Sequence, residues 1–188
     1  MEDRFNRAEA DFELSSTLAP GSDFGTVGIG VTYLETGNAP DAIQLMRKHL
    51  YESPNDASLL YLLGEALLRN GASSGSAEYV EAQSALEKSV RFNPNLCLPH
   101  VALGEIYLDE DRYSDAAKQL EQAKTIDPNE TSAYSHLAVA YRKLGDMDRA
   151  KQALQALKEI HQREEGWTHM QMKTGDNPDA DSPHTQQR

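Results

Sequence analysis

Residues 97–128 read CLPHVALGEIYLDEDRYSDAAKQLEQAKTIDP, and their residue pattern decides the fold. Leu103 and Tyr107 are four residues apart, so they share one face of a predicted first helix. Gly104 and Ala116 are small residues placed where a second helix should cross the first, because a larger side chain would push the two backbones apart. The stretch therefore predicts a pair of antiparallel helices.

The same residue types recur along the chain, with 34 residues between Gly30 and Gly64 and again between Gly104 and Ala138. The residue three places further on is Tyr33, Leu67, Tyr107 or Tyr141, and the second helix of each unit carries Ala42, Ala82, Ala116 or Ala150. Pro54, Pro94 and Pro128 close the first three units, since proline cannot continue a helix. This pattern resembles the tetratricopeptide repeat (TPR) family, whose unit is a helix-turn-helix of 34 residues.

The resemblance implies an all-α fold, a right-handed α-solenoid of stacked antiparallel helix pairs. We expect four repeats, and a polar, disordered tail over residues 165–188, where apolar residues are too few to offset the entropy of ordering. The repeats span 23–56, 57–96, 97–130 and 131–164, and residues 1–22 should form the second helix of an incomplete N-terminal repeat.

Repeat 57–96 is longer than the others, and we place the insertion at residues 72–80. Such insertions usually form loops on one edge of the array. The segment is either a loop without a role or a partner contact that includes Tyr79 and Val80.

Composition excludes several functional classes. Hydrophobic residues make up 39% of the chain, with no run long enough to span a membrane, so we expect no membrane insertion. The net charge of −12 argues against nucleic acid, because phosphate binding requires a basic stripe. The single cysteine, Cys97, is interpreted as a small packing residue.

No motif for catalysis, cofactor binding or metal binding is found. The six histidines lack the spacing of a zinc site, and we do not expect His100 and His136 to share a metal. No nucleophile and base are paired, so an enzyme is not expected.

In TPR proteins the first helices line a concave groove that docks peptides or helices. The resemblance places twelve residues of this chain there: Val27, Val31, Leu34, Tyr61, Glu65, Leu68, Val101, Glu105, Leu108, Ser135, His136 and Val139. The surface is apolar and mildly acidic. We therefore predict a scaffold that docks a peptide or helix carrying apolar and basic residues. The alternatives are packing residues that bind nothing, or an accessory segment of a larger enzyme or envelope-assembly protein.

Two expectations concern the start of the chain. A second helix without its partner leaves Phe5 and Phe12 short of cover, so self-association or an upstream chain should cover them. The absence of a signal peptide suggests a cytoplasmic location, unless the N-terminus is truncated.

Overall fold

The computed structural model describes residues 24–174 and holds eight helices there, with no strand among those residues. The predicted helix over residues 1–22, with Phe5 and Phe12, lies outside the described part. The helices are α2 (Phe24–Glu35), α3 (Ala39–Glu52), α4 (Ala57–Arg69), α5 (Ala77–Phe92), α6 (Cys97–Asp109), α7 (Tyr113–Ile126), α8 (Thr131–Lys143) and α9 (Met147–Thr174). None of these helices is both long enough and apolar enough to cross a membrane.

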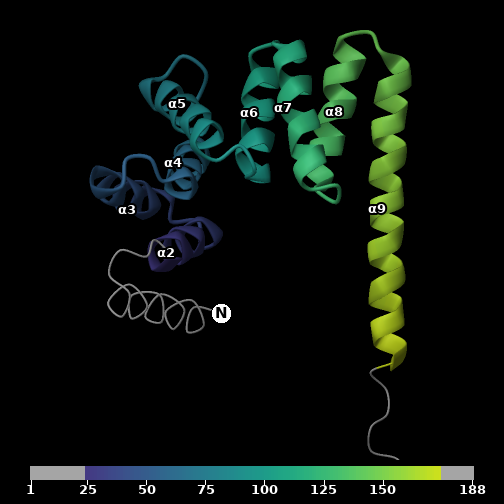
Figure 1. The fold of residues 1–188 in the computed structure, drawn as a ribbon, viewed down its shortest axis with the longest axis horizontal. Coiled ribbons are helices and arrows are strands. Elements are labelled where there is room, and N and C mark those ends of the chain that lie inside the picture. The colour runs from purple at the N-terminus through teal and green to yellow at the C-terminus, as the bar shows by residue number, and fades with distance from the viewer. Residues whose placement is uncertain (1–23, 175–188) are drawn as a thin grey trace, which may run out of the picture.

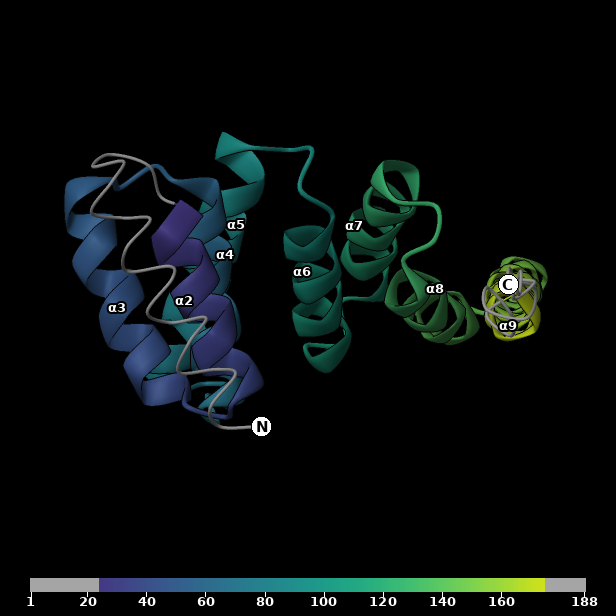
Figure 2. The same cartoon turned by 90° about the horizontal axis from the view of Figure 1, so that it is seen from below.

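The helices pair in sequence and stack into an arch (Figures 1 and 2). Each helix packs on the next, and the first helices of neighbouring pairs, α2, α4, α6 and α8, also contact one another in turn. The fold is therefore an all-α solenoid of the TPR type. α3, α5 and α7 each end two residues before the proline that closes their unit.

Small residues allow the close crossings inside each pair. A Cβ added to Gly104 would lie 2.5 Å from Cγ of Leu120 on α7, and one added to Gly64 would lie 2.6 Å from Cγ of Leu86 on α5. Leu86 and Leu120 occupy the space that a side chain at these glycines would need, and both are fully buried.

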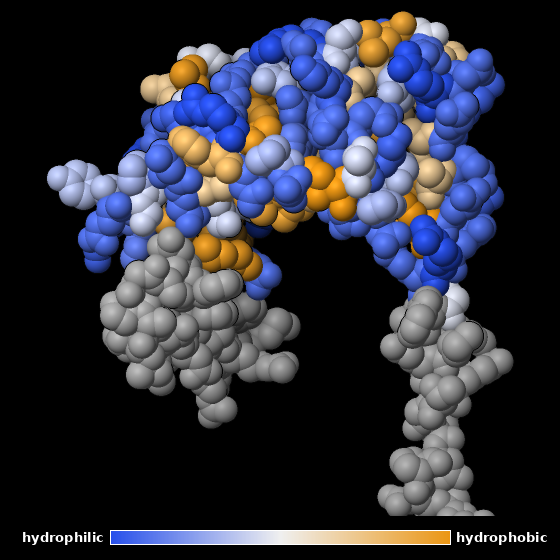
Figure 3. All heavy atoms as spheres, viewed as in Figure 1, coloured by the Kyte–Doolittle hydropathy of each residue, from blue (hydrophilic) through white to orange (hydrophobic). Residues whose placement is uncertain are grey.

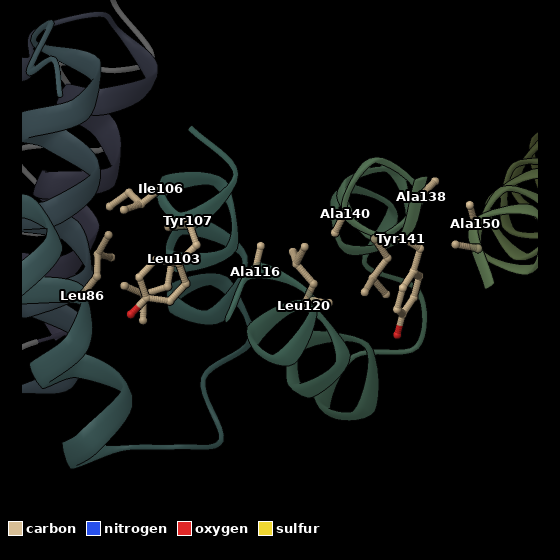
Figure 4. Packing of buried hydrophobic residues seen from close by; sticks show 14 of the residues in the cluster. Leu86, Leu103, Ile106, Tyr107, Ala116, Leu120, Ala138, Ala140, Tyr141 and Ala150 are labelled. Atoms are coloured by element: carbon tan, nitrogen blue, oxygen red, sulfur yellow. The ribbon is translucent and has the colours of Figure 1, made fainter. Parts of the chain in front are cut away.

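A continuous apolar core runs between the pairs. Leu86 points toward Leu103 and Tyr107 across the boundary between the second and third units (Figure 4). Leu120 and Tyr141, from the third and fourth units, belong to the same buried cluster and are labelled in this view. Three units thus share one core, as stacked repeats require.

The turns inside the pairs use left-handed backbone. Gly145 has φ +80°, and Asp111 holds the same position in the third unit with φ 57°. A short polar side chain tolerates this conformation better than most others, which explains how the third unit dispenses with glycine.

The insertion is shorter than the expected 72–80, because α5 already begins at Ala77. Ser76 caps the helix, its hydroxyl accepting a hydrogen bond from the Tyr79 backbone N–H at 3.1 Å. Tyr79 is only 5% exposed and so is not available for the partner contact considered for this segment, whereas Val80 is 61% exposed. Tyr79 lies three residues before Ala82, as Ala39 lies before Ala42, so it belongs to the helix pair and not to the loop.

The last helix is longer than expected. We predicted that the polar tail begins at residue 165, but α9 continues to Thr174. A glycine inside a helix costs only about 1 kcal/mol relative to alanine, so Gly166 does not end α9. Stronger signals, Gly175 and Pro178, follow its last residue.

Candidate functional site

The first helices α2 and α4 border the hollow of the arch. In Figure 1, α2 and α4 lie nearer this hollow than their partners α3 and α5. Apolar surface gathers along the inner edge in the space-filling view (Figure 3). We refer to the twelve residues predicted for this surface as the concave face.

Exposure divides the concave face into three groups. Val31 and Glu105 are exposed, and eight residues are partly buried: Val27, Tyr61, Glu65, Leu68, Leu108, Ser135, His136 and Val139. Leu34 and Val101 are buried, at 7% and 6% exposure, and contribute little surface. Ten of the twelve residues can therefore contact a ligand.

One apolar residue was missed by the sequence prediction. Leu98 on the first turn of α6 is 47% exposed. It precedes Glu105 by two helical turns and so lies on the same face of α6. The same spacing rule that selected Glu105 could have found it.

An arginine neutralises the first of the two predicted carboxylates. Nε of Arg69 lies 2.6 Å from Oε1 of Glu65, one turn earlier on α4. Nη1 of Arg69 also donates a hydrogen bond to the Leu34 carbonyl on α2, at 3.3 Å. Arg69 was not predicted, although its i+4 spacing from Glu65 is a readable signal for a pair.

The second carboxylate faces a histidine from the neighbouring first helix. Nδ1 of His136 is buried and lies 3.5 Å from Oε1 of Glu105, and it makes no hydrogen bond within the described chain. Burial raises the pKa of Glu105, and the negative charges of Glu65 and Asp109 raise it further, whereas His136 opposes them. Glu105 thus remains an acceptor that no arginine or lysine satisfies in residues 24–174.

Tyr61 lies beside both carboxylates. Burial raises the pKa of its hydroxyl, and the charges of Glu65 and Glu105 add to this effect. The phenol is therefore neutral at physiological pH, and it offers a ligand an aromatic ring with a hydrogen-bonding group.

His100 and Cys97 have structural roles. His100 is 4% exposed, with Nδ1 2.7 Å from Oε1 of Gln119 and Nε2 3.0 Å from the Pro94 carbonyl. The Cys97 thiol lies 3.4 Å from the Ala123 carbonyl, and burial raises its pKa to about 11. Residues 24–174 contain no group of three or more histidine, cysteine, aspartate or glutamate side chains that could hold a metal.

A cleft of about 500 Å³ opens between α7, α8 and α9. It forms where Ala153 and Ala156 replace the larger Gln119 and Gln122 of the preceding unit. The groups around it are already paired: the Tyr141 hydroxyl donates to Glu121 at 2.7 Å, and the Arg149 guanidinium stacks 4.4 Å above the Tyr141 ring.

The preceding unit repeats this arrangement. The Tyr107 hydroxyl donates to Glu87 at 3.3 Å, and Arg112 lies 4.1 Å above the Tyr107 ring. Because the same set recurs, we interpret it as a joint between units and not as a ligand site.

Comparison with known proteins agrees with this architecture. Models of the tetratricopeptide repeat match residues 27–87 and 107–171. No curated protein matches the chain by sequence. A crystal structure of MamA superposes with a TM-score of 0.68 at 22% identity, covering 88% of this chain and 93% of MamA. TTC0263, a thermophilic TPR protein of Thermus thermophilus, gives 0.65 at 22% identity, covering 86% and 89%.

A third solved structure is YrrB, described as a TPR protein with an unusual peptide-binding site. It superposes with a TM-score of 0.60 at 20% identity, covering 84% of this chain and 78% of YrrB. These likenesses concern the fold. The repeat matches and the stacked helix pairs together show that this chain belongs to the tetratricopeptide repeat family.

Proposed function

We propose that the chain is a protein-interaction scaffold whose concave face docks a peptide or helix with apolar anchors and one central Lys or Arg. The observation that carries the proposal is Glu105, a carboxylate 49% exposed that has no arginine or lysine partner in residues 24–174 and is set among partly buried apolar side chains. A cation of the ligand would satisfy this carboxylate. Charge would steer such a ligand and apolar contact would hold it.

The apolar anchors would occupy the surfaces on either side of Glu105. Leu108 lies on the same helix, and Leu68 and Val139 come from α4 and α8. Each is partly buried, so a ligand side chain can remove the rest of its surface from water. YrrB, which shares the fold, is described as having a peptide-binding site, and this supports a peptide as the ligand.

The structure changes which carboxylate should be tested first. Glu65 is held by Arg69, so a ligand cation would compete with a bond that already exists. Glu105 faces only the imidazole of His136, 3.5 Å away, and no arginine or lysine among residues 24–174. We therefore expect Glu105→Gln to weaken binding more than Glu65→Gln.

Selection of displayed random peptides on the immobilised full chain tests the proposal. Enriched peptides should combine apolar residues with Lys or Arg and bind with micromolar affinity, on the order of 8 kcal/mol. Their affinity should fall in Glu105→Lys and in Leu108→Ala. Glu52→Lys is the matched control, because Glu52 is exposed on the second helix α3.

Two outcomes would contradict the proposal. One is enrichment of acidic or purely polar peptides. The other is an equal affinity of the selected peptides for wild type, Glu105→Lys and Leu108→Ala.

A further inference from the structure

The C-terminal end of the helix array presents an apolar stripe that has no partner in the described chain. α9 packs on α8 alone, and Figures 1 and 2 show no described helix beyond it. Inside the array the corresponding helix α7 is covered on both sides, by α6 and by α8. The open face of α9 therefore corresponds to the face of α7 that receives α8.

Equivalent residues show the difference directly. Leu120 follows Ala116 by four residues and is completely buried, as are Leu86 and Met46 in their units. Leu154 follows Ala150 by four residues and is 54% exposed. Met147, two turns before Leu154, is 55% exposed on the same side. The apolar residues of the repeat pattern are therefore present on α9 but exposed, and a further helix packed there would bury them.

Between Met147 and Lys158, the charged residues on this face of α9 are lysines. Lys151 and Lys158 lie three residues before and four residues after Leu154, so they flank it on the same helix face. Both are exposed, and neither takes part in an ion pair of the described residues. In a chain with a net charge of −12, two unpaired lysines beside an exposed leucine form a local exception.

Comparison with the interior joint explains why Lys158 is unpaired. On α7, Lys124 pairs with Glu121, and Glu121 accepts the hydroxyl of Tyr141. The residue of α9 that corresponds to Glu121 is Gln155, which bonds Glu159 instead. Lys158, the counterpart of Lys124, is left without that carboxylate.

We propose that the stripe formed by Met147, Lys151, Leu154 and Lys158 docks an amphipathic helix of another polypeptide, one that carries Asp or Glu beside its apolar residues. This helix packs on α9 as α8 packs on α7. A second copy packed with its own α9 stripe against this one would bring the lysines of both copies together, and the repulsion between like charges disfavours this arrangement. Residues 175–188 contain acids, but alanine is their only apolar residue.

The surface differs from the concave face in the sign of charge that it selects, so the two can be tested separately. The probe is a stapled synthetic helix of the length of α8, with Leu, Ala and Tyr spaced as Leu137, Ala138 and Tyr141 are, and with Glu beside them. A second probe has Lys in place of every Glu. Fluorescence anisotropy measures both against the full-length chain.

We expect the Glu probe to bind wild type and the Lys probe to bind more weakly. Leu154→Ser should weaken the Glu probe by about tenfold or more, since it removes the apolar contact. The double variant Lys151→Glu with Lys158→Glu should reverse the preference between the probes. Lys118→Glu, which changes an exposed lysine on α7, should leave the binding of the Glu probe unchanged.

Equal binding of the two probes, or no binding of either, would overturn the proposal. So would a Glu probe that binds Leu154→Ser as tightly as wild type. Sedimentation equilibrium tests the second copy as the occupant: a wild-type dimer that becomes a monomer in Leu154→Ser would assign the stripe to self-association and overturn the proposal.

Discussion

At the scale of single residues, the paired helices can approach closely because a glycine, which has no side chain, lies where they cross. Gly104 has no Cβ, and Leu120 fills the space that a Cβ would need. Ala116 lies in the first turn of the opposite helix, α7, and is fully buried. Close packing of this kind leaves little room for even one added methyl group.

Two helical glycines give a matched pair for this point. Gly104→Ala should destabilise the protein by roughly 1 to 3 kcal/mol, since the new Cβ forces Leu120 to move. Gly166→Ala should stabilise it by up to about 1 kcal/mol, because no atom lies within 4 Å of its Cβ position and alanine favours the helix. Urea melts measure both. Equal or reversed effects would contradict the crossing described here.

Glu105 should contribute to the pH dependence of the free energy of unfolding. Its folded pKa is raised, so the folded protein holds this proton more tightly than the unfolded chain does. Stability therefore falls as pH rises through the window between the unfolded and folded pKa values. Glu105→Gln should gain stability relative to wild type from about pH 4 to pH 7. Urea midpoints at both pH values check this, and a loss over that range would refute it.

Single departures from the repeat pattern were readable in the sequence, but their meaning was not. Thr26 stands where the pattern has an aromatic residue, and His49 stands where it has a small one. In the structure the two meet: Oγ1 of Thr26 lies 3.3 Å from Nδ1 of His49. Relative to the repeat pattern, the large and the small residue at this contact between two helices are exchanged. Sequence spacing alone does not reveal that two substitutions occupy the same space.

At the scale of helices, end signals decide where the elements begin and stop. The repeat pattern predicted helix pairs because glycines, alanines and prolines recur in register. It did not fix the ends of α5 and α9, because those ends depend on local capping and not on the repeat. Ser76 starts α5 inside the expected insertion, and Gly166 is too weak a signal to stop α9.

The cap of α5 can be tested with two serines of one loop. Ser76→Ala should destabilise the protein by about 1 kcal/mol, because the backbone N–H of Tyr79 loses its acceptor. Ser74→Ala should change stability by less than about 0.5 kcal/mol, since Ser74 is exposed in the same loop. Thermal or urea unfolding separates the two variants, and equal midpoints would show that Ser76 is not the cap.

At the scale of the whole molecule, the arrangement of charge matters more than its total. The chain carries −12, yet the concave face has one carboxylate without an arginine or lysine partner, and α9 has two lysines without an ion pair, among residues 24–174. The concave face is a prediction from the sequence, because the repeat register indicates which helices should line it. The partner of Glu65 was also readable, since Arg69 follows it by four residues on the same helix. The exposed stripe on α9 was not, since its exposure depends on which helices pack together.

The most direct test of the scaffold role is to map where a selected peptide binds, by NMR chemical-shift changes on the full chain. We predict that the largest changes occur at Tyr61, Leu68, Glu105, Leu108 and Val139, from three neighbouring first helices. Changes confined to α3, α5 and α7, with these five residues unaffected, would contradict the account.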